Sequence, residues 1–229
     1  MLEARKKISK KEMKEDKLVT GYYKFQSFFM ENQVKILIGL GTIAVIVVAY
    51  ILYNNKINSD NQSASVLVAK VTPLLESGAY QVAIDGVPAQ NITGLKKIVN
   101  EYGSSEEGEL AKVLLANAYS ITGKSEEALK LYDDYSGSNS LLKASALAGK
   151  AGILESKKEY EKAADLYQQA AKIEKTNPSN PEFLLKAGAA YLKLGNKEEA
   201  RTLFETIKKD YATAIPYMEL DKYFVQTEN

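Results

Sequence analysis

The stretch over residues 36–53, ILIGLGTIAVIVVAYILY, constrains this chain more than any other, because its eighteen residues carry no charge. As an α-helix at about 1.5 Å per residue, it would cover roughly 27 Å, close to the ~30 Å hydrocarbon core of a bilayer. Lys35 can extend its ammonium group toward the near interface, and Tyr50 and Tyr53 suit the far one. We therefore predict a transmembrane signal-anchor helix over residues 34–53.

Two other interpretations of the apolar run are a buried core helix of a soluble protein and a cleaved signal peptide. Buried helices rarely run for so many uncharged residues. A signal peptide would need a charged region of more than thirty residues, and no small-x-small cleavage site closely follows the run. Both are therefore disfavoured.

Charge on the two sides of the apolar run predicts its orientation. Residues 1–32 hold eight lysines and arginines, whereas the twenty residues after Tyr53 hold two, Lys56 and Lys70. Positive charge near a membrane helix stays on the cytoplasmic side. We therefore expect a single-pass protein with a cytoplasmic basic tail over residues 1–33 and most of its mass outside the cytosol.

Both flanks of the run have a distinct character. Residues 21–32, GYYKFQSFFMEN, are rich in aromatic side chains, which favour the headgroup level of a bilayer. They predict a short interfacial segment, with a docking helix for a membrane partner as the alternative. Residues 54–65, NNKINSDNQSAS, are polar and small, and they predict a spacer or the first turns of a continued helix.

Composition after the apolar run excludes several classes of function. Residues 54–229 carry 21 basic and 24 acidic side chains, which leaves no electrostatic footprint for nucleic acid. The chain has no cysteine and no histidine, so thiol chemistry and the commonest metal ligand and general base are missing. No glycine spacing matches a phosphate-binding loop. We expect no enzyme, no cofactor or metal, and no small-molecule substrate.

An internal repeat organises residues 66–229. Three segments align at steps of 35 and 37 residues, and each places an alanine four residues before an aromatic side chain. These pairs are Ala128 and Tyr132, Ala163 and Tyr167, and Ala200 and Phe204. A period near 34 with this small-large alternation indicates helix-turn-helix units, in which the alanine permits close helix contact and the aromatic ring fills the adjacent gap.

The aligned segments resemble the tetratricopeptide repeat family. The first unit departs from the family by placing Lys112 where a tryptophan is expected, and the second by placing Lys158 where a glycine is expected. Together with the apolar run, the resemblance implies an all-α fold: a single N-terminal transmembrane helix followed by a tetratricopeptide-type α-solenoid. Its expected parts are a partial repeat at 66–86, a helix at 94–102, repeats at about 109–137, 141–175 and 181–210, and a capping helix at 215–226.

The order of basic tail, membrane helix, spacer and repeat domain is similar to that of the ancillary Sec translocon subunit family of Gram-negative bacteria. The elements AIDG (83–86), GLKKIVNEY (94–102), GELAKVLLANAY (108–119) and PEFLLKAGAAYLKLGNKEEA (181–200) read like the periplasmic domain of that family. The resemblance implies a location in the bacterial inner membrane with a periplasmic C-terminal domain. It also implies association with the Sec translocon and with periplasmic chaperones that receive emerging chains.

A solenoid of helix pairs presents a concave groove formed by one face of each first helix. By repeat register, the expected protein-binding residues are Val113, Asn117, Ser120, Ala148, Gly152, Glu155, Leu185, Ala189 and Leu192. This set suits an extended or helical apolar segment better than a charged tail. The alternative is that some of these side chains pack on the capping helix.

Some co-chaperones of the tetratricopeptide family clamp a terminal carboxylate with basic and asparagine side chains at set groove positions. Here Val113, Gly149 and Glu182 occupy three of those positions and only Asn117 matches, which argues against such a clamp.

The leading hypothesis is a non-enzymatic, membrane-tethered scaffold that joins the Sec translocon to periplasmic chaperones or emerging chains. A translocon-independent periplasmic chaperone that holds substrates is the second hypothesis. An organellar import-type receptor would follow if the topology were reversed, and an enzyme is the most distant option.

The charge asymmetry generates a first test. We expect protease added to intact spheroplasts to digest the chain after Asn54 and to leave the tail before Gln33 intact, because the basic flank stays inside. Immunoblotting with antibodies against each end would measure this. Protection of the C-terminal domain would instead support the import-receptor hypothesis.

Overall fold

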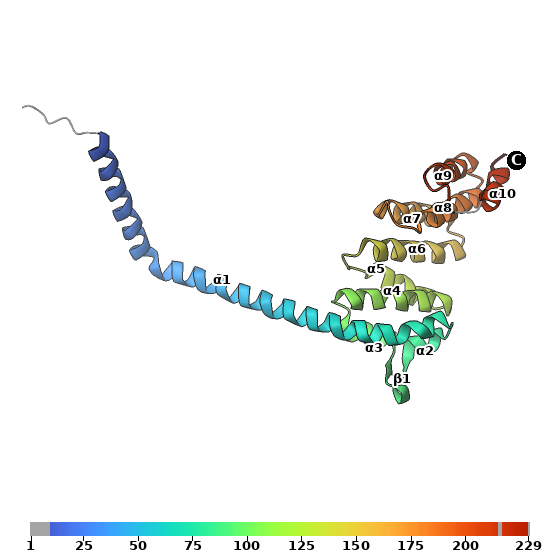
Figure 1. Cartoon of the computed structure of the whole chain (residues 1–229), viewed down its shortest axis with the longest axis horizontal. Coiled ribbons are helices and arrows are strands. Elements are labelled where there is room, and N and C mark those ends of the chain that lie inside the picture. The colour runs from blue at the N-terminus through green and yellow to red at the C-terminus, as the bar shows by residue number, and fades with distance from the viewer. Residues whose placement is uncertain (1–9, 215–216, 229) are drawn as a thin grey trace, which may run out of the picture. The chain divides into compact units, whose positions relative to one another are not determined.

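A computed structural model describes residues 10–214 and 217–228, and it confirms an all-α fold class (Figure 1). Residues 1–9 of the expected basic tail and residues 215–216 of the expected capping helix lie outside the described residues. The chain forms two compact units, residues 1–56 and residues 57–229, and helix α1 (Lys10–Glu76) contributes to both. Each unit is described by itself.

The described part of the first unit is the N-terminal portion of α1. It contains a window that is long and apolar enough to cross a membrane, and none of that window is buried. The Thr42 hydroxyl donates a hydrogen bond of 2.9 Å to the Ile38 carbonyl, so this polar group is satisfied within the helix. The aromatic side chains of residues 21–32 are exposed along the same helix.

The second unit begins at Ile57, earlier than the expected domain start at residue 66. Residues 54–65 are helical, and one face of α1 joins the domain core through Ala64, Val68 and Val71, which are 0–5% exposed. The Glu107 backbone N–H also donates to the Asn61 side-chain oxygen at 2.8 Å. Most of the segment predicted as a spacer or continued helix is therefore the start of the domain's first helix.

The partner of that first helix is split into two parts, α2 (Tyr80–Asp85) and α3 (Leu95–Tyr102). Between them lies a hairpin of β1 (Gly86–Val87), a 3-10 turn η1 (Pro88–Gln90) and β2 (Ile92–Thr93). Figure 1 shows this hairpin projecting away from α4–α9. The sequence did not reveal it, because strands of two residues leave no alternation to detect.

Repeat register explains the split. Counted from Ala200, the core residues Phe204 and Ile207 and the half-buried Tyr211 follow at +4, +7 and +11. Counted from Ala83, their counterparts Leu95, Ile98 and Tyr102 follow at +12, +15 and +19. Each offset is larger by eight residues. Helices α2 and α3 therefore form the second helix of a complete first helix-turn-helix repeat, and eight inserted residues interrupt that helix. Together they contain 14 helical residues, as many as α7 or α9.

The base of the hairpin is narrow. A Cβ on Gly86 would overlap the Gly94 backbone, and a Cβ on Gly94 would overlap the Asp85 and Gly86 backbones. Gly86 also has a φ of 82°, which side chains rarely adopt. The Asp85 carboxylate accepts hydrogen bonds from Gln81 and from Lys96, and these bonds lower its pKa. These contacts bring the end of α2 next to the start of α3.

Three helix pairs follow. They are α4 (Glu106–Ile121) with α5 (Ser125–Asp133), α6 (Ser140–Ser156) with α7 (Tyr160–Ile173), and α8 (Asn180–Leu194) with α9 (Lys197–Asp210). Ala128, Ala163 and Ala200 are each 0% exposed, as close helix contacts require. Lys158, which replaces the expected glycine, adopts a φ of 63°, so the turn keeps its left-handed form despite the side chain.

Helix α10 (Tyr217–Glu228) covers the end of the solenoid. The rings of Tyr223 and Phe224 lie 5.3 and 5.9 Å from the ring of Phe204, and the Lys208 ammonium lies 5.7 Å from the Phe224 ring. The last apolar surface of α8 and α9 is therefore shielded from water.

The insertion can be tested by removing it. Deleting residues 87–94 with Gly86→Ala should join α2 and α3 into one helix that keeps Leu95 and Ile98 in the core, so thermal unfolding followed by circular dichroism should show a melting temperature no lower than that of the parent. As the matched control, deleting residues 88–94 rotates α3 by about 100° and should cost more than about 3 kcal/mol, since two apolar side chains lose their burial. Equal stability of both deletions would contradict the register.

Candidate functional site: a neutral groove on the first helices

A pocket of about 420 Å³ lies across helices α4, α6 and α8 of the second unit. We call it the first-helix groove. Its lining residues are Asn117, Ser120, Ile121, Tyr132, Ser145, Ala148, Gly149, Gly152, Tyr167, Ser179, Phe183 and Lys186. The helices of three successive units thus contribute to one surface.

Four of the nine residues predicted from register line this groove, namely Asn117, Ser120, Ala148 and Gly152. Two others do not reach a surface: Val113 is 2% exposed and Leu185 is 8% exposed, and both belong to the core. A first helix packs on its own partner helix and on neighbouring helices, which leaves only a narrow strip open. Register alone predicts the face but not the width of that strip.

The remaining three predicted residues are not among the residues that line it. Glu155 is half-buried and accepts a hydrogen bond of 3.0 Å from the Tyr167 hydroxyl. Ala189 and Leu192 are half-buried, and Leu192 packs against the core cluster of α8 and α9.

Tyr132 links the core to the groove. Its ring lies where a Cβ on Gly149 would be, and its hydroxyl donates a hydrogen bond of 2.6 Å to the Asn117 side-chain oxygen. Burial raises the pKa of Tyr132 to about 12, so the hydroxyl stays protonated and remains a donor. The repeat pattern predicts a packing role alone for this residue. In the sequence, the one signal that Tyr132 also makes a hydrogen bond at the groove is its hydroxyl group. Phe204, at the equivalent position of the last repeat, has no hydroxyl.

The charged side chain that lines the groove is paired with an opposite charge. Among the described residues that line it, one is charged, Lys186, whose ammonium lies 2.8 Å from the Glu182 carboxylate and 5.9 Å from the Tyr167 ring centroid. Burial, and then the neighbouring Glu155, raise the pKa of Tyr167. The surface therefore offers neutral hydrogen-bonding groups rather than a net charge.

A second pocket, of about 700 Å³, lies between α3 and α5 over α4. Leu115 and Leu131 are among its apolar lining residues, and Lys96, Glu127 and Lys130 are among the charged ones. Its mixed charges indicate no single class of ligand.

Lys112 also lines this second pocket, and it has a structural role. Its ammonium donates to the Glu109 carboxylate at 2.7 Å and to the Asp134 carbonyl at 2.9 Å, and the two paired side chains are only 12% and 6% exposed. Glu109 also accepts bonds from the Ser136 backbone and hydroxyl. The lysine that replaces the family's tryptophan therefore fastens the end of α5 to α4.

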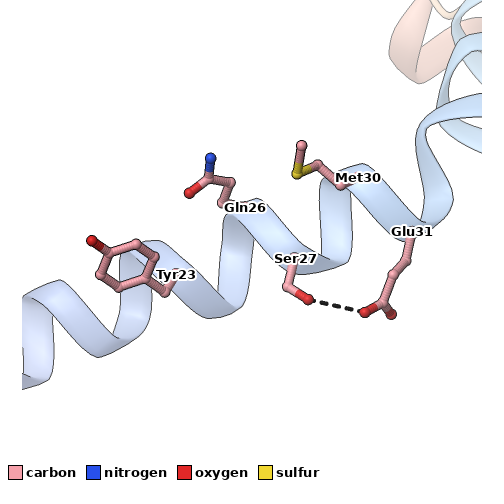
Figure 2. A pocket seen from close by; sticks show the side chains of 5 residues that line it. All are labelled: Tyr23, Gln26, Ser27, Met30 and Glu31. Atoms are coloured by element: carbon pink, nitrogen blue, oxygen red, sulfur yellow. Dashed lines mark hydrogen bonds between the residues drawn. The ribbon is translucent and has the colours of Figure 1, made fainter.

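The N-terminal compact unit, residues 1–56, has a shallow, open hollow on α1 (Figure 2). Tyr23, Gln26, Ser27, Met30 and Glu31 line it, and the Ser27 hydroxyl donates to the Glu31 carboxylate at 2.9 Å. All five residues belong to one helix, so the residues that line this hollow contact a ligand from one side.

Two family models match the repeat domain, both described as tetratricopeptide repeat, over residues 113–178 and 154–219. The chain carries tetratricopeptide repeats. Such repeats form protein-binding scaffolds, and neither match indicates a catalytic family. No curated protein and no solved structure matches the chain. The first helix-turn-helix repeat, which contains the inserted hairpin, lies before both matched ranges. This is expected if the hairpin breaks the repeat pattern.

The buried Tyr132 generates a pH prediction. Its pKa is about 12 in the folded protein and about 10 in an unfolded chain, so its contribution to stability is complete below pH 10 and is lost as the pH rises toward 12. Between pH 9.5 and 11.5, the wild type should lose roughly 2 kcal/mol more stability than Tyr132→Phe. Urea midpoints at each pH would measure this, and parallel pH profiles would show that the hydroxyl is not buried.

Proposed function

We propose that this protein is a non-enzymatic scaffold, tethered to the outer face of the bacterial inner membrane, that joins the Sec translocon to periplasmic chaperones or emerging chains. The supporting observation is that an exposed, uncharged helical run and a packed repeat domain share one helix, α1.

The short distance along the chain supports a client at the membrane. The packed unit begins at Ile57, four residues after the apolar run ends at Tyr53. Even fully extended, four residues span at most roughly 14 Å. Tethering raises the effective concentration only of partners within reach, so a domain held this closely favours clients that emerge at the bilayer surface.

Orientation and partner are supported by different features. The lysine and arginine asymmetry across the apolar run favours a domain outside the cytosol. The order of tail, membrane helix and repeat domain resembles the ancillary Sec translocon subunits, and this resemblance favours the translocon as the membrane partner. The neutral first-helix groove supports the alternative of a periplasmic chaperone that holds substrates without the translocon.

The test is co-purification of the full-length protein from native membranes in a mild detergent. We expect Sec translocon subunits in the eluate, at a level that falls when residues 36–53 are exchanged for an unrelated apolar helix. Ser120→Arg in the groove should leave the translocon signal unchanged and reduce contact with chaperones or emerging chains, as quantified by crosslinking and mass spectrometry. Absence of every translocon subunit would favour the free-standing chaperone.

A further inference from the structure

Residues 17–31 of α1 carry an apolar face that the described residues of their compact unit leave uncovered. At ~100° per helical residue, Tyr22, Phe25 and Phe29 lie within about 60° of one another around the helix. Their side chains are 63%, 67% and 45% exposed. A contiguous surface of large apolar side chains marks a place that another molecule or a membrane covers.

The opposite face of the same segment is polar. Thr20, Lys24 and Glu31 lie within about 40° of one another and roughly opposite to the aromatic residues. The Glu31 carboxylate accepts the bond from the Ser27 hydroxyl on this side of the helix. Residues 17–35 carry three lysines and one glutamate, a net charge of +2. An aromatic face with a cationic polar face is typical of a helix that lies in the plane of a membrane surface.

The place of this face in the chain favours lipid as its occupant. Tyr22 precedes Ile36, the first residue of the apolar run, by fourteen positions. A straight helix that crosses a bilayer through the run would carry Tyr22 about 21 Å beyond the hydrocarbon core and leave the aromatic face in water. A helix that turns at the bilayer surface places the same face at the headgroup level, which aromatic side chains favour.

Helix α1 bends in the same compact unit. Figure 1 shows that the dark blue first part of α1 and the lighter blue part that follows run in different directions. Between the aromatic face and the apolar run, the Asn32 side-chain amide donates a hydrogen bond of 3.0 Å to the Phe28 carbonyl, and the Lys35 ammonium donates to the Asn32 side-chain oxygen at 3.5 Å. Side-chain bonds to the carbonyl four residues earlier compete with the helix ladder and bend helices.

We propose that residues 17–31 form an in-plane helix on the membrane surface beside the N-terminal end of the apolar run. Tyr22, Phe25 and Phe29 lie among the lipid headgroups, and Lys17 and Lys24 lie within a Debye length of anionic phospholipids. The occupant of the apolar face is thus the bilayer itself. This inference rests on the membrane tether of the proposed function but not on the translocon. The in-plane helix holds the run at one depth, because moving it inward would bury the lysines.

The experiment measures depth with a single introduced tryptophan, because the chain has none of its own. The full-length protein is placed in vesicles of phosphatidylethanolamine and phosphatidylglycerol, without other proteins, that contain a lipid brominated on its acyl chain just below the headgroup. Tyr22→Trp and Phe25→Trp should be quenched to a similar extent, because an in-plane helix holds both at one depth. Thr20→Trp, on the polar face, is the matched control and should be quenched far less.

Two outcomes would overturn the proposal. A straight helix would leave all three tryptophans unquenched, and the aromatic face would then await a protein partner. Equal quenching of all three would show a segment inserted into the bilayer without regard to its polar face.

The lipid class is tested by removing charge. With Phe25→Trp as the reporter, Lys17→Gln together with Lys24→Gln should lower the quenching at least about twofold, as should vesicles of phosphatidylcholine alone. The matched control is Lys143→Gln with Lys193→Gln, which removes two exposed lysines of the repeat domain and should leave the quenching unchanged. Equal quenching in anionic and neutral vesicles would overturn the assignment to anionic lipid.

This inference and the proposed function can fail separately. Ile43→Trp, within the apolar run, reports the membrane tether alone, and its quenching without quenching of Phe25→Trp would refute the in-plane helix and leave the tether standing. Quenching of both without any capture of the translocon would support the in-plane helix and refute the Sec link. An unquenched Ile43→Trp would refute both proposals.

Discussion

The repeat domain depends on one contact, made once in each unit, between a buried alanine of the second helix and the first helix beside it. Ala128, Ala163 and Ala200 are fully buried, and the aromatic residue four positions later fills the space that the close approach creates. Tyr132 and Phe204 in turn require glycine at positions 149 and 188. Small and large side chains thus alternate between helices, and a larger residue at any small position would force the helices apart.

The same contact explains why a hairpin can interrupt the first unit. The inserted residues enter after α2 and leave before α3, and Leu95 and Ile98 recover the core positions that Phe204 and Ile207 hold in the last unit. The backbones at the hairpin base meet at Gly86 and Gly94, and Leu95 and Ile98 are buried, so α3 keeps its core positions. An insertion that keeps the phase of the core leaves stacking between units intact.

The side chains that pack the helices together also shape the first-helix groove. Tyr132 reaches it because the ring lies against Gly149 and directs the hydroxyl to Asn117, and Tyr167 directs its hydroxyl to Glu155. The side chains that hold the units together therefore also orient the polar groups of the surface. Gly152 is the exception, since a Cβ there would meet only the Tyr167 hydroxyl oxygen, at 3.4 Å.

The sequence by itself determined the apolar helix, the repeat period, the alanine and aromatic positions and the fold class, because these depend on local periodicity and composition. It also placed Asn117, Ser120, Ala148 and Gly152 on the open face. Only the tertiary structure decided that Val113 and Leu185 are buried, that residues 57–65 belong to the domain and that α2 and α3 are one interrupted helix. Those outcomes depend on contacts between segments far apart in the chain, such as Asn61 with Glu107, which no local pattern encodes.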